Sequence, residues 1–302
     1  MDERPKKIER VSLVSRVAVR CFQMIPLGLR KWFFTIIALL FYHLFPRHRL
    51  IALYNLKMSF PEKELREIIA IAKKVYLNFA LVSAEFFEIP RLAKEGVEEM
   101  VDIEGLEICR RGLEKGRGLL LFSAHFSNWE LAAAAASLFL RPVPTTVLYR
   151  PLDNKILEDL VYHIRSSSGN MPLSKEKSMR QIIRSLQRNE VIGILIDQNV
   201  ARREGVFVNF FQRPACTTDG LAQLALRTRA PVVPIFLLRM GAGTYRLIVR
   251  EEIEIVDTGD WDADVIVNTQ NFTRAIEDMV RLYPDQWFWV HNRWKTKPWQ
   301  VV

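Results

Sequence analysis

The sequence predicts an α/β fold in which a mostly parallel sheet is flanked by helices. Short apolar runs alternate with stretches of helical period through residues 96–302. Polar residues of distinctive chemistry, among them His125 and Asp197, directly follow such runs. With 302 residues, 49% of them hydrophobic, the chain is long enough for one large α/β domain with an N-terminal extension. Strands that alternate with helices form largely parallel sheets covered on both faces.

Residues 1–95 are predicted to form a membrane-associating helical region. Residues 1–10 are charged and polar, and we expect them to be mobile. Residues 32–45 contain nothing charged at pH 7 when His43 is neutral. These residues would extend roughly 21 Å as a helix, less than the ~30 Å hydrocarbon core of a bilayer. Basic residues flank both ends, so we favour a helix that lies in or partly enters the membrane over one that spans it.

The alternative for this segment is a helix buried in the protein core. We expect no cleavable signal peptide, because the small-residue cleavage pattern is missing.

A second helix is predicted over residues 65–86, where apolar residues recur at three- and four-residue steps before Pro90. Residues 59–62 match a capping box that would start it. We interpret it as a core-packed helix, and the alternative is a basic face that meets anionic headgroups.

The remaining elements follow in alternation. Residues 119–122 are an apolar run that predicts a buried strand, and residues 131–140 predict an alanine-rich helix. The later elements, in order, are strand 143–149, a helix capped by Asp153 that stops near Gly169, helix 177–187, strand 190–196, helix 219–229, strands 231–238 and 245–256, and helix 268–282.

His125 lies in the turn between the first strand and the alanine-rich helix, where open α/β sheets bind their ligands. A neutral imidazole there can accept a proton from a hydroxyl, and Glu130 can hold its other ring nitrogen. A structural histidine is the alternative. A metal site is less favoured because no second histidine follows at the spacing of zinc peptidases. No cofactor is expected.

Two further polar positions follow strands. Arg150 ends strand 143–149, and Asp197 with Gln198 ends strand 190–196. The carboxyl ends of parallel strands meet at one edge of a sheet, so we expect these residues to share a cleft with His125.

The segment His125-Phe-Ser-Asn-Trp-Glu130 resembles the H-x4-D/E box of glycerolipid acyltransferases. Its glutamate and internal Asn-Trp are similar to those of the bacterial lipid A late acyltransferases, the lauroyl and myristoyl transferases. Other segments resemble further elements of this family in the same order, namely residues 49–61, 149–151, 197–198, 210–215, 230–234 and 284–295. Two residues depart from the family pattern: Gln212 stands where the family usually has glycine, and Asn292 where it often has arginine. These departures bear on substrate choice more than on reaction type.

The resemblance implies a glycerolipid acyltransferase-like fold that transfers an acyl chain from an acyl carrier protein thioester to a hydroxyl of a lipid A precursor. It places the protein at the cytoplasmic face of the bacterial inner membrane. His125 would be the general base, oriented by Glu130, and backbone amides of residues 127–129 would stabilise the oxyanion. The expected substrate-binding residues are Arg150, Arg165, Asp197, Gln198 and Asn128. For Arg165 and Asp197, an ordinary surface arginine and a capping aspartate are the alternatives.

Composition favours anionic partners. The net charge is +9 and the pI about 9.6, which suits an anionic lipid, a membrane surface or an acidic protein. No nucleic-acid recognition motif is found, so nucleic acid is not expected as a partner. Three widely spaced cysteines indicate a reducing compartment without a disulfide framework. The C-terminal tryptophans, with basic residues among them, fit either a membrane interface or a core-closing segment; they are Trp287, Trp289, Trp294 and Trp299.

Three other functions stay open. The first is an acyltransferase that uses the same motif on another acceptor, such as a phosphatidylinositol mannoside, an ornithine lipid or a lysophospholipid. A non-catalytic lipid-binding protein would keep His125 and Glu130 as structural residues. A serine hydrolase would use Ser123 or Ser127, although neither lies in a G-x-S-x-G elbow.

Overall fold

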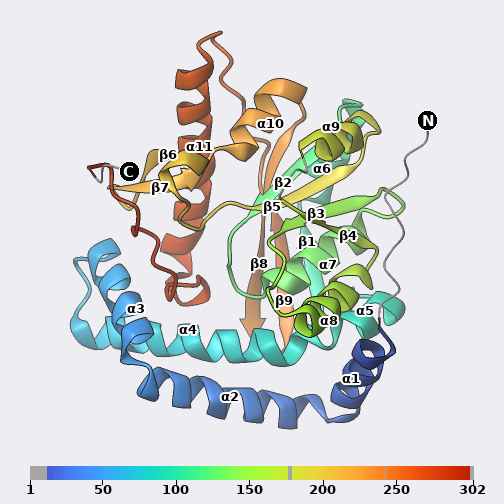
Figure 1. Ribbon diagram of the computed structural model, residues 1–302, viewed down its shortest axis with the longest axis vertical. Coiled ribbons are helices and arrows are strands. Elements are labelled where there is room, and N and C mark those ends of the chain that lie inside the picture. Colours follow the sequence, from blue (N-terminus) through green and yellow to red (C-terminus); the bar gives the residue numbers. More distant parts are fainter. Residues whose placement is uncertain (1–11, 176–178, 242, 300–302) are drawn as a thin grey trace.

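A seven-stranded sheet forms the centre of the protein (Figure 1). The computed structural model describes residues 12–175, 179–241 and 243–299. The strand order is β1-β9-β8-β2-β5-β3-β4. Every neighbouring pair is parallel except β8 and β9, so the predicted mostly parallel sheet is confirmed. The strands are β1 (Val101–Glu104), β2 (Leu119–Ser123), β3 (Thr145–Tyr149), β4 (Asn170–Ser174), β5 (Val191–Leu195), β8 (Val232–Gly241) and β9 (Thr244–Val249).

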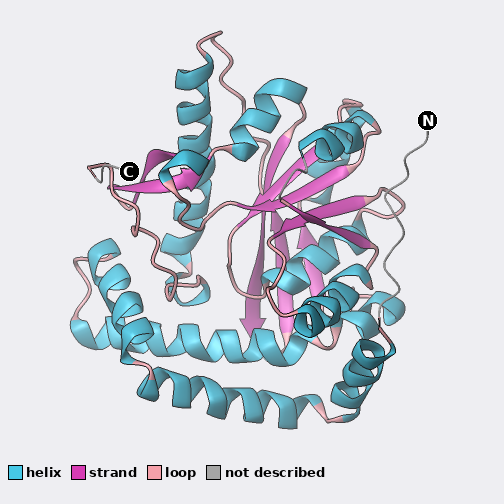
Figure 2. Ribbon diagram, in the orientation of Figure 1, coloured by secondary structure: helices cyan, strands magenta, loops and turns pink. Residues whose placement is uncertain are grey.

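β2 is the strand that positions the site. All five of its residues are buried, because β5 and β8 flank it and helices cover both faces of the sheet (Figure 2). A strand covered on both faces has no polar side, which explains the unbroken apolar run. The covering helices are α5 (Ile89–Glu95), α6 (Leu106–Glu114), α7 (Trp129–Phe139), α8 (Lys155–Ser166), α9 (Met179–Gln187), α10 (Gly220–Thr228) and α11 (Trp261–Leu282).

A separate antiparallel hairpin, β6 (Gly205–Phe210) and β7 (Arg213–Thr218), packs against α11. Its turn residues Phe211 and Gln212 have φ angles of 51° and 57°. This left-handed backbone favours glycine, which accounts for the glycine that the family pattern has at the position of Gln212. Two short 3₁₀ turns, η1 (Arg202–Glu204) and η2 (Pro284–Gln286), complete the connections.

The first four described helices form the N-terminal region: α1 (Leu13–Met24), α2 (Leu27–Leu44), α3 (Pro46–Ser59) and α4 (Leu65–Phe86). The predicted bounds of α4 are confirmed, but the predicted cap is wrong. Ser59 is the last residue of α3, and the capping box is formed by Glu64 and Glu67. Because α3 was not expected, the capping pattern at residues 59–62 was assigned to α4. Residues 60–64 instead connect α3 to α4.

α2 runs beside α4 (Figure 1). Of the described helices, it is the one whose length and apolar composition would let it cross a membrane, with a mean hydropathy of 1.3 over 18 residues. It begins earlier than expected, at Leu27, directly after Pro26. Arg30, Ala38 and Tyr42 are buried toward the protein, whereas most of its large apolar side chains are exposed. The alternative of a fully buried core helix is therefore wrong.

The largest hydrophobic core joins the N-terminal helices to the sheet. It contains Leu56 and Ile68 from α3 and α4 together with Phe122 and Trp289. Trp287, Trp289 and Trp294 are all buried, so the core-closing interpretation holds for them, whereas Trp299 is 73% exposed. The domain boundary expected after residue 95 stays a prediction.

Other local expectations need correction. Asn154, not Asp153, caps α8, and α11 begins at Trp261, seven residues before the expected start, with Asp260 as its cap. β9 ends at Val249, well short of residue 256. Residues 1–10 and the first two residues of the predicted helix 177–187 lie outside the described residues. All three cysteines are free. Elements that were not anticipated are mostly short: α1, α3, α5, α6, β1, β4, β6 and β7.

Candidate active site

His125 and Asp197 meet because their strands are adjacent and parallel. Ser123 at the end of β2 pairs with Leu195 at the end of β5. Each polar residue lies two positions beyond its strand, so the register brings the two side chains together at the carboxyl edge of the sheet. The predicted convergence of these two residues is confirmed.

Asp197 binds His125 through both carboxylate oxygens. Oδ1 lies 2.8 Å from Nδ1 of the imidazole, and Oδ2 accepts the backbone N–H of His125 at 2.9 Å. The indole Nε1–H of Trp287 donates to Oδ2 at 2.8 Å. Because an ionised carboxylate only accepts, the imidazole carries its proton on Nδ1 and presents a lone pair at Nε2. The side-chain amide of Gln198 lies at that Nε2, 3.2 Å away.

The electrostatics of the pair keep Asp197 ionised and His125 basic. Burial favours the neutral form of Asp197, but the adjacent His125 outweighs it and lowers the pKa of the carboxyl to about 2. Burial also opposes the imidazolium of His125, but Asp197, and to a smaller degree Glu130, raise its pKa above the ordinary value of 6.5. This arrangement suits a group that accepts a proton near neutral pH.

Glu130 has a different partner from the one expected. Its carboxylate accepts two hydrogen bonds from Arg165 on α8, from Nε at 2.8 Å and from Nη2 at 2.6 Å. The indole of Trp129 donates to it as well, at 3.2 Å. The expectation that Glu130 orients the imidazole is therefore wrong: Asp197 holds Nδ1, and Glu130 holds Arg165. The physical reason is that Glu130 lies in the first turn of α7, where its carboxylate reaches Arg165 on α8.

Arg165 joins the site through its pair with Glu130, whereas a substrate contact of Arg150 stays a prediction. Burial opposes the charge of Arg165, but Glu130 outweighs burial and raises the pKa of the guanidinium further. Its guanidinium also lies over the ring of Tyr149, 5.6 Å from the ring centre. Arg150 is exposed, and within the described part of the chain no ion pair joins it to the carboxylates of Asp197 or Glu130.

Asn128 is part of the scaffold. Its side chain is fully buried; Oδ1 caps α7 by accepting from the N–H of Leu131, and Nδ2 donates to Glu85. Both ends of its side chain thus support the fold, and the expectation that Asn128 binds substrate stays a prediction. Of the backbone amides expected to stabilise an oxyanion, that of Ser127 donates to the carbonyl of Gln286 at 2.6 Å and is thereby committed elsewhere.

The two serines of the turn do not form a nucleophile–base pair. Ser127 is fully buried, and its hydroxyl has no hydrogen-bond partner. Ser123 is a buried residue of β2. Across the described ranges, no hydrogen bond joins either hydroxyl to His125, as a serine hydrolase would require.

The C-terminal segment completes the site, and the sequence analysis missed its role. Phe288 donates its N–H to the carbonyl of His125 at 3.0 Å, and the imidazole of His291 accepts the N–H of Asn199 at 2.8 Å. Burial lowers the pKa of His291 to about 4, which keeps this second imidazole neutral beside the first. The dense aromatic and polar pattern of residues 284–295 was the signal that could have identified this contact.

An apolar groove adjoins the site. It lies between α2 and α4, has a volume of about 170 Å³, and is closed by Phe288, whose neighbours include Trp129. Trp129 in turn lies 5.3 Å from the ring of His125. The groove is lined by Phe34, Ile37, Ala38, Phe41, Val75, Tyr76, Phe79, Ala80, Ser83, Phe288 and Val290.

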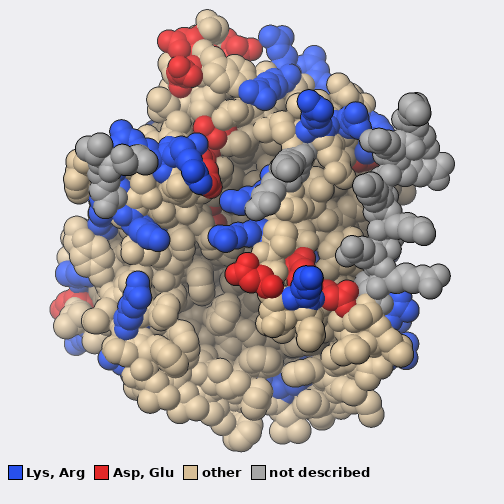
Figure 3. All heavy atoms as spheres, in the orientation of Figure 1, with Lys and Arg blue, Asp and Glu red and all other residues tan. Residues whose placement is uncertain are grey.

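The surface around the site is divided by charge. Figure 3 shows one face that is hollowed near its centre, with Lys and Arg side chains gathered above the hollow. The part of this face below it, over α2 and α4, is largely uncharged. Among the residues that the structure describes, no group of three or more His, Cys, Asp or Glu side chains is arranged to hold a metal ion.

Comparison with known proteins identifies the family. The model of the family described as bacterial lipid A biosynthesis acyltransferase matches residues 10–296. The chain belongs to this family. It is therefore an acyltransferase, and the family resemblance of the H-x4-E segment is confirmed.

Individual relatives align over most of the chain. The lipid A biosynthesis palmitoleoyltransferase of Escherichia coli (strain K12) is 29% identical over 259 residues, 83% of this chain and 80% of that protein. The lipid A biosynthesis lauroyltransferase of the same strain is 29% identical over 248 residues, 81% and 78% of the two chains. A phosphatidylinositol mannoside acyltransferase of Mycolicibacterium smegmatis is 25% identical over 221 residues, 72% and 70%.

Proposed function

We propose that this acyltransferase moves a fatty acyl chain from an acyl carrier protein thioester to a hydroxyl of a lipid A precursor, with His125 as general base. The observation that carries the proposal is the His125–Asp197 pair at the sheet edge, which presents the Nε2 lone pair of a basic imidazole. The family and its lipid A acyltransferases support the reaction class and the acceptor.

In this mechanism the acceptor hydroxyl takes the place of the Gln198 amide at Nε2 of His125. The hydroxyl loses its proton to Nε2 as its oxygen attacks the thioester carbonyl. The new ester C–O bond forms, the C–S bond breaks, and the proton passes from the imidazolium to the departing thiolate. A well-placed general base contributes about 10²–10⁴-fold to the rate. Asp197 stabilises the imidazolium that forms in between.

Arg165 is proposed to bind an anionic group of the substrate or the developing oxyanion. Its pair with Glu130 uses Nε and Nη2, which leaves the Nη1 hydrogens for such a group. Glu130 then acts as the residue that aims the guanidinium. Arg150, at the exposed end of β3, is kept as a candidate contact for the acceptor headgroup at the mouth of the cleft.

The groove between α2 and α4 is proposed to hold the acyl chain. Its lining is almost entirely apolar, and Phe288 and Trp129 connect it to His125. The acidic carrier protein and the anionic acceptor both suit the Lys and Arg side chains above the hollow and the net charge of +9.

The membrane surface is proposed as the place of the reaction, at the cytoplasmic face of the bacterial inner membrane. α2 packs along α4 with one side and exposes apolar side chains on the other, among them Trp32, Phe33 and Leu40. A helix held along the protein in this way suits insertion into the interface more than a perpendicular span. Flotation with anionic vesicles should carry the wild type upward, and Phe33→Glu with Leu40→Glu should leave the protein in the soluble fraction.

A different lipid acceptor is the second candidate. The likeness to a phosphatidylinositol mannoside acyltransferase favours it, because the same family chemistry serves another glycolipid there. The base and its carboxylate would be unchanged, and only the headgroup contacts would differ.

The test is acyl transfer from radiolabelled acyl-acyl carrier protein by purified protein. Kdo2-lipid A precursor, a phosphatidylinositol mannoside and lysophosphatidic acid serve as parallel acceptors. We expect product on the lipid A precursor, and a loss of about 10²–10⁴-fold in His125→Ala. His163→Ala, on α8 outside the site, is the matched histidine control.

Each other outcome has a distinct meaning. Product on another acceptor alone would change the proposed substrate class and leave the proposed reaction chemistry unchanged. Full activity in a folded His125→Ala protein would refute the general-base mechanism. Labelling of the wild type by a fluorophosphonate probe would favour a serine hydrolase instead.

A further inference from the structure

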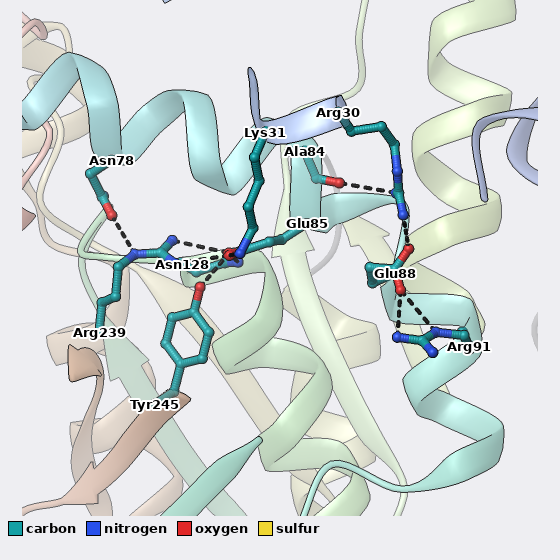
Figure 4. Close-up of polar contacts among 10 residues, drawn as sticks. All are labelled: Arg30, Lys31, Asn78, Ala84, Glu85, Glu88, Arg91, Asn128, Arg239 and Tyr245. Atoms are coloured by element: carbon teal, nitrogen blue, oxygen red, sulfur yellow. Dashed lines mark hydrogen bonds and ion pairs between the residues drawn. The ribbon is translucent and has the colours of Figure 1, made fainter. Parts of the chain in front are cut away.

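The long helix α4 holds the turn that carries His125 at two points. The side-chain Nδ2 of Asn78 donates to the carbonyl of Ser127 at 3.0 Å, and Glu85 accepts from Nδ2 of Asn128 at 3.0 Å. Asn78 and Glu85 lie seven residues apart, about two helical turns, and so share one face of α4. Figure 4 shows both side chains directed toward the same region beside the sheet.

Arg239, at the carboxyl end of β8, joins these two side chains. Its Nε donates to Oδ1 of Asn78 at 3.1 Å, and its Nη1 and Nη2 donate to Glu85 at 2.9 and 3.0 Å (Figure 4). Because Arg239 occupies the oxygen of Asn78, the amide NH₂ must face Ser127. Burial opposes the charge of Glu85, but Arg239 outweighs it and keeps the pKa of the carboxyl below its usual range.

The clamped turn has a backbone that needs support. Ser127 is fully buried with a φ of 48°, a left-handed conformation that costs a residue other than glycine roughly 1–2 kcal/mol. Asn128 is the N-cap of α7. A shift of this turn would move the backbone N–H of His125, which donates one of the two hydrogen bonds between His125 and Asp197.

We infer that Asn78, Glu85 and Arg239 are positioning residues of the proposed transferase reaction, which hold the turn 125–128 so that His125 stays aligned on Asp197. The inference rests on the proposed function. The three residues touch neither Nε2 of His125 nor the groove, so they act through the turn on the chemical step. Their loss should lower kcat and leave the KM for the acceptor nearly unchanged.

Asn78→Asp is the sharpest variant. The aspartate keeps an oxygen for Nε of Arg239 but loses the N–H donor to Ser127, and it adds a negative charge. Because an added negative charge would raise the pKa of His125, a fall in that pKa reports the lost support of the turn. A misplacement of catalytic groups near 1 Å costs up to about 10²-fold in rate, and we expect a fall in kcat of about 10–10² with KM changed less than about twofold. A looser contact with Asp197 should also lower the pKa of His125, which nuclear magnetic resonance of the ¹⁵N-labelled imidazole measures without substrate.

Glu88 provides the matched control. It lies three residues after Glu85, is also a buried carboxylate, and is paired with Arg30 and Arg91 (Figure 4). Glu85→Gln and Glu88→Gln therefore remove a similar buried charge, the first from the last turn of α4 and the second from the junction between α4 and α5. We expect both to lower the melting temperature, and only Glu85→Gln to lower kcat and the pKa of His125.

The decisive outcomes do not depend on the identity of the acceptor. An unchanged His125 resonance and pKa in Asn78→Asp would overturn the inference, as would equal changes in Glu85→Gln and Glu88→Gln. Full activity of His125→Ala would instead refute the proposed base mechanism, while the imidazole titration of Asn78→Asp would still report whether the turn is held by α4.

Discussion

Two carboxylates lie at the candidate site, and they differ in their separation from His125 along the sequence. Glu130 follows His125 by five residues and binds Arg165, whereas Asp197 follows it by 72 residues and binds the imidazole itself. Glu130 lies in the first turn of a helix, where it reaches Arg165 on α8, and Asp197 lies two residues beyond β5, the strand next to β2. Strand register, not sequence proximity, decides which acid holds the base.

The His125–Asp197 and Glu130–Arg165 pairs also differ in their exposure to solvent. Asp197 is nearly inaccessible, and its carboxylate accepts from the backbone and ring of His125 and from Trp287. Glu130 is more open, and its partner Arg165 keeps about a quarter of its side chain exposed. The first arrangement suits a fixed proton-transfer geometry, and the second suits a cation that meets a substrate.

Asp197→Asn should have the largest effect on this comparison. An asparagine keeps the shape of the side chain but offers the imidazole no negative charge, and it can hold the wrong tautomer. By analogy with catalytic triads we expect kcat to fall by about 10²–10⁴-fold. Steady-state transfer assays at saturating acceptor measure it. Retention of more than a tenth of the wild-type kcat would contradict the role assigned to the His125–Asp197 pair.

Glu130→Gln should have a smaller effect of a different kind. Arg165 loses its charged partner, so its guanidinium is oriented less firmly, while His125 and Asp197 are unchanged. We expect a fall of about 10–10²-fold in kcat/KM, carried in part by a higher KM for the acceptor. Arg165→Lys, which keeps the charge without the fork of donors, should behave alike. Losses of the same size and kind as in Asp197→Asn would remove the distinction between the two carboxylates.

The pH profile should separate the two pairs next. The base must be neutral, so kcat/KM falls as pH drops through the pKa of His125, which lies above 6.5 in the wild type. Without the charge of Asp197, burial dominates and this acidic limb should move to lower pH. In Glu130→Gln the limb should move less, because Asp197 raises the pKa of His125 more than Glu130 does. A larger shift in Glu130→Gln than in Asp197→Asn would reverse the comparison.

Trp287→Phe should give the smallest change in rate. The phenyl ring fills most of the indole site, but the hydrogen bond to Oδ2 of Asp197 is lost. Hydrogen bonds to charged groups contribute about 1.5–3 kcal/mol, so we expect the free energy of unfolding to fall by about this amount. Chemical denaturation measures it. The rate should fall less than about tenfold, because both bonds from Asp197 to His125 remain. Unchanged stability would mean that the hydrogen bond from Trp287 to Asp197 does not stabilise the protein.

Much of the fold followed from local patterns. The apolar run at residues 119–122, the spacing over residues 65–86 and the alternation of strands with helices were each confirmed as elements. β1 and β4 were missed because they are the edge strands of the sheet, and each has only its first residue buried, so neither has the apolar run that marks β2. The cap of α4 was misassigned, since an acceptable pattern at residues 59–62 lay inside the unexpected end of α3.

The residues of the site were determined locally, and their partners were not. The position of His125 after a buried strand, and of Asp197 after another, could be read from the chain because strand ends are local features. That β2 and β5 are neighbours, with Ser123 opposite Leu195, depends on the order of strands in the sheet. The partner of Glu130 depends on where the first turn of α7 lies relative to Arg165 on α8, and the partner of Asn128 depends on Glu85 of α4. Contacts between distant segments are set by packing of the whole core, and therefore only the tertiary structure decided which carboxylate serves the imidazole.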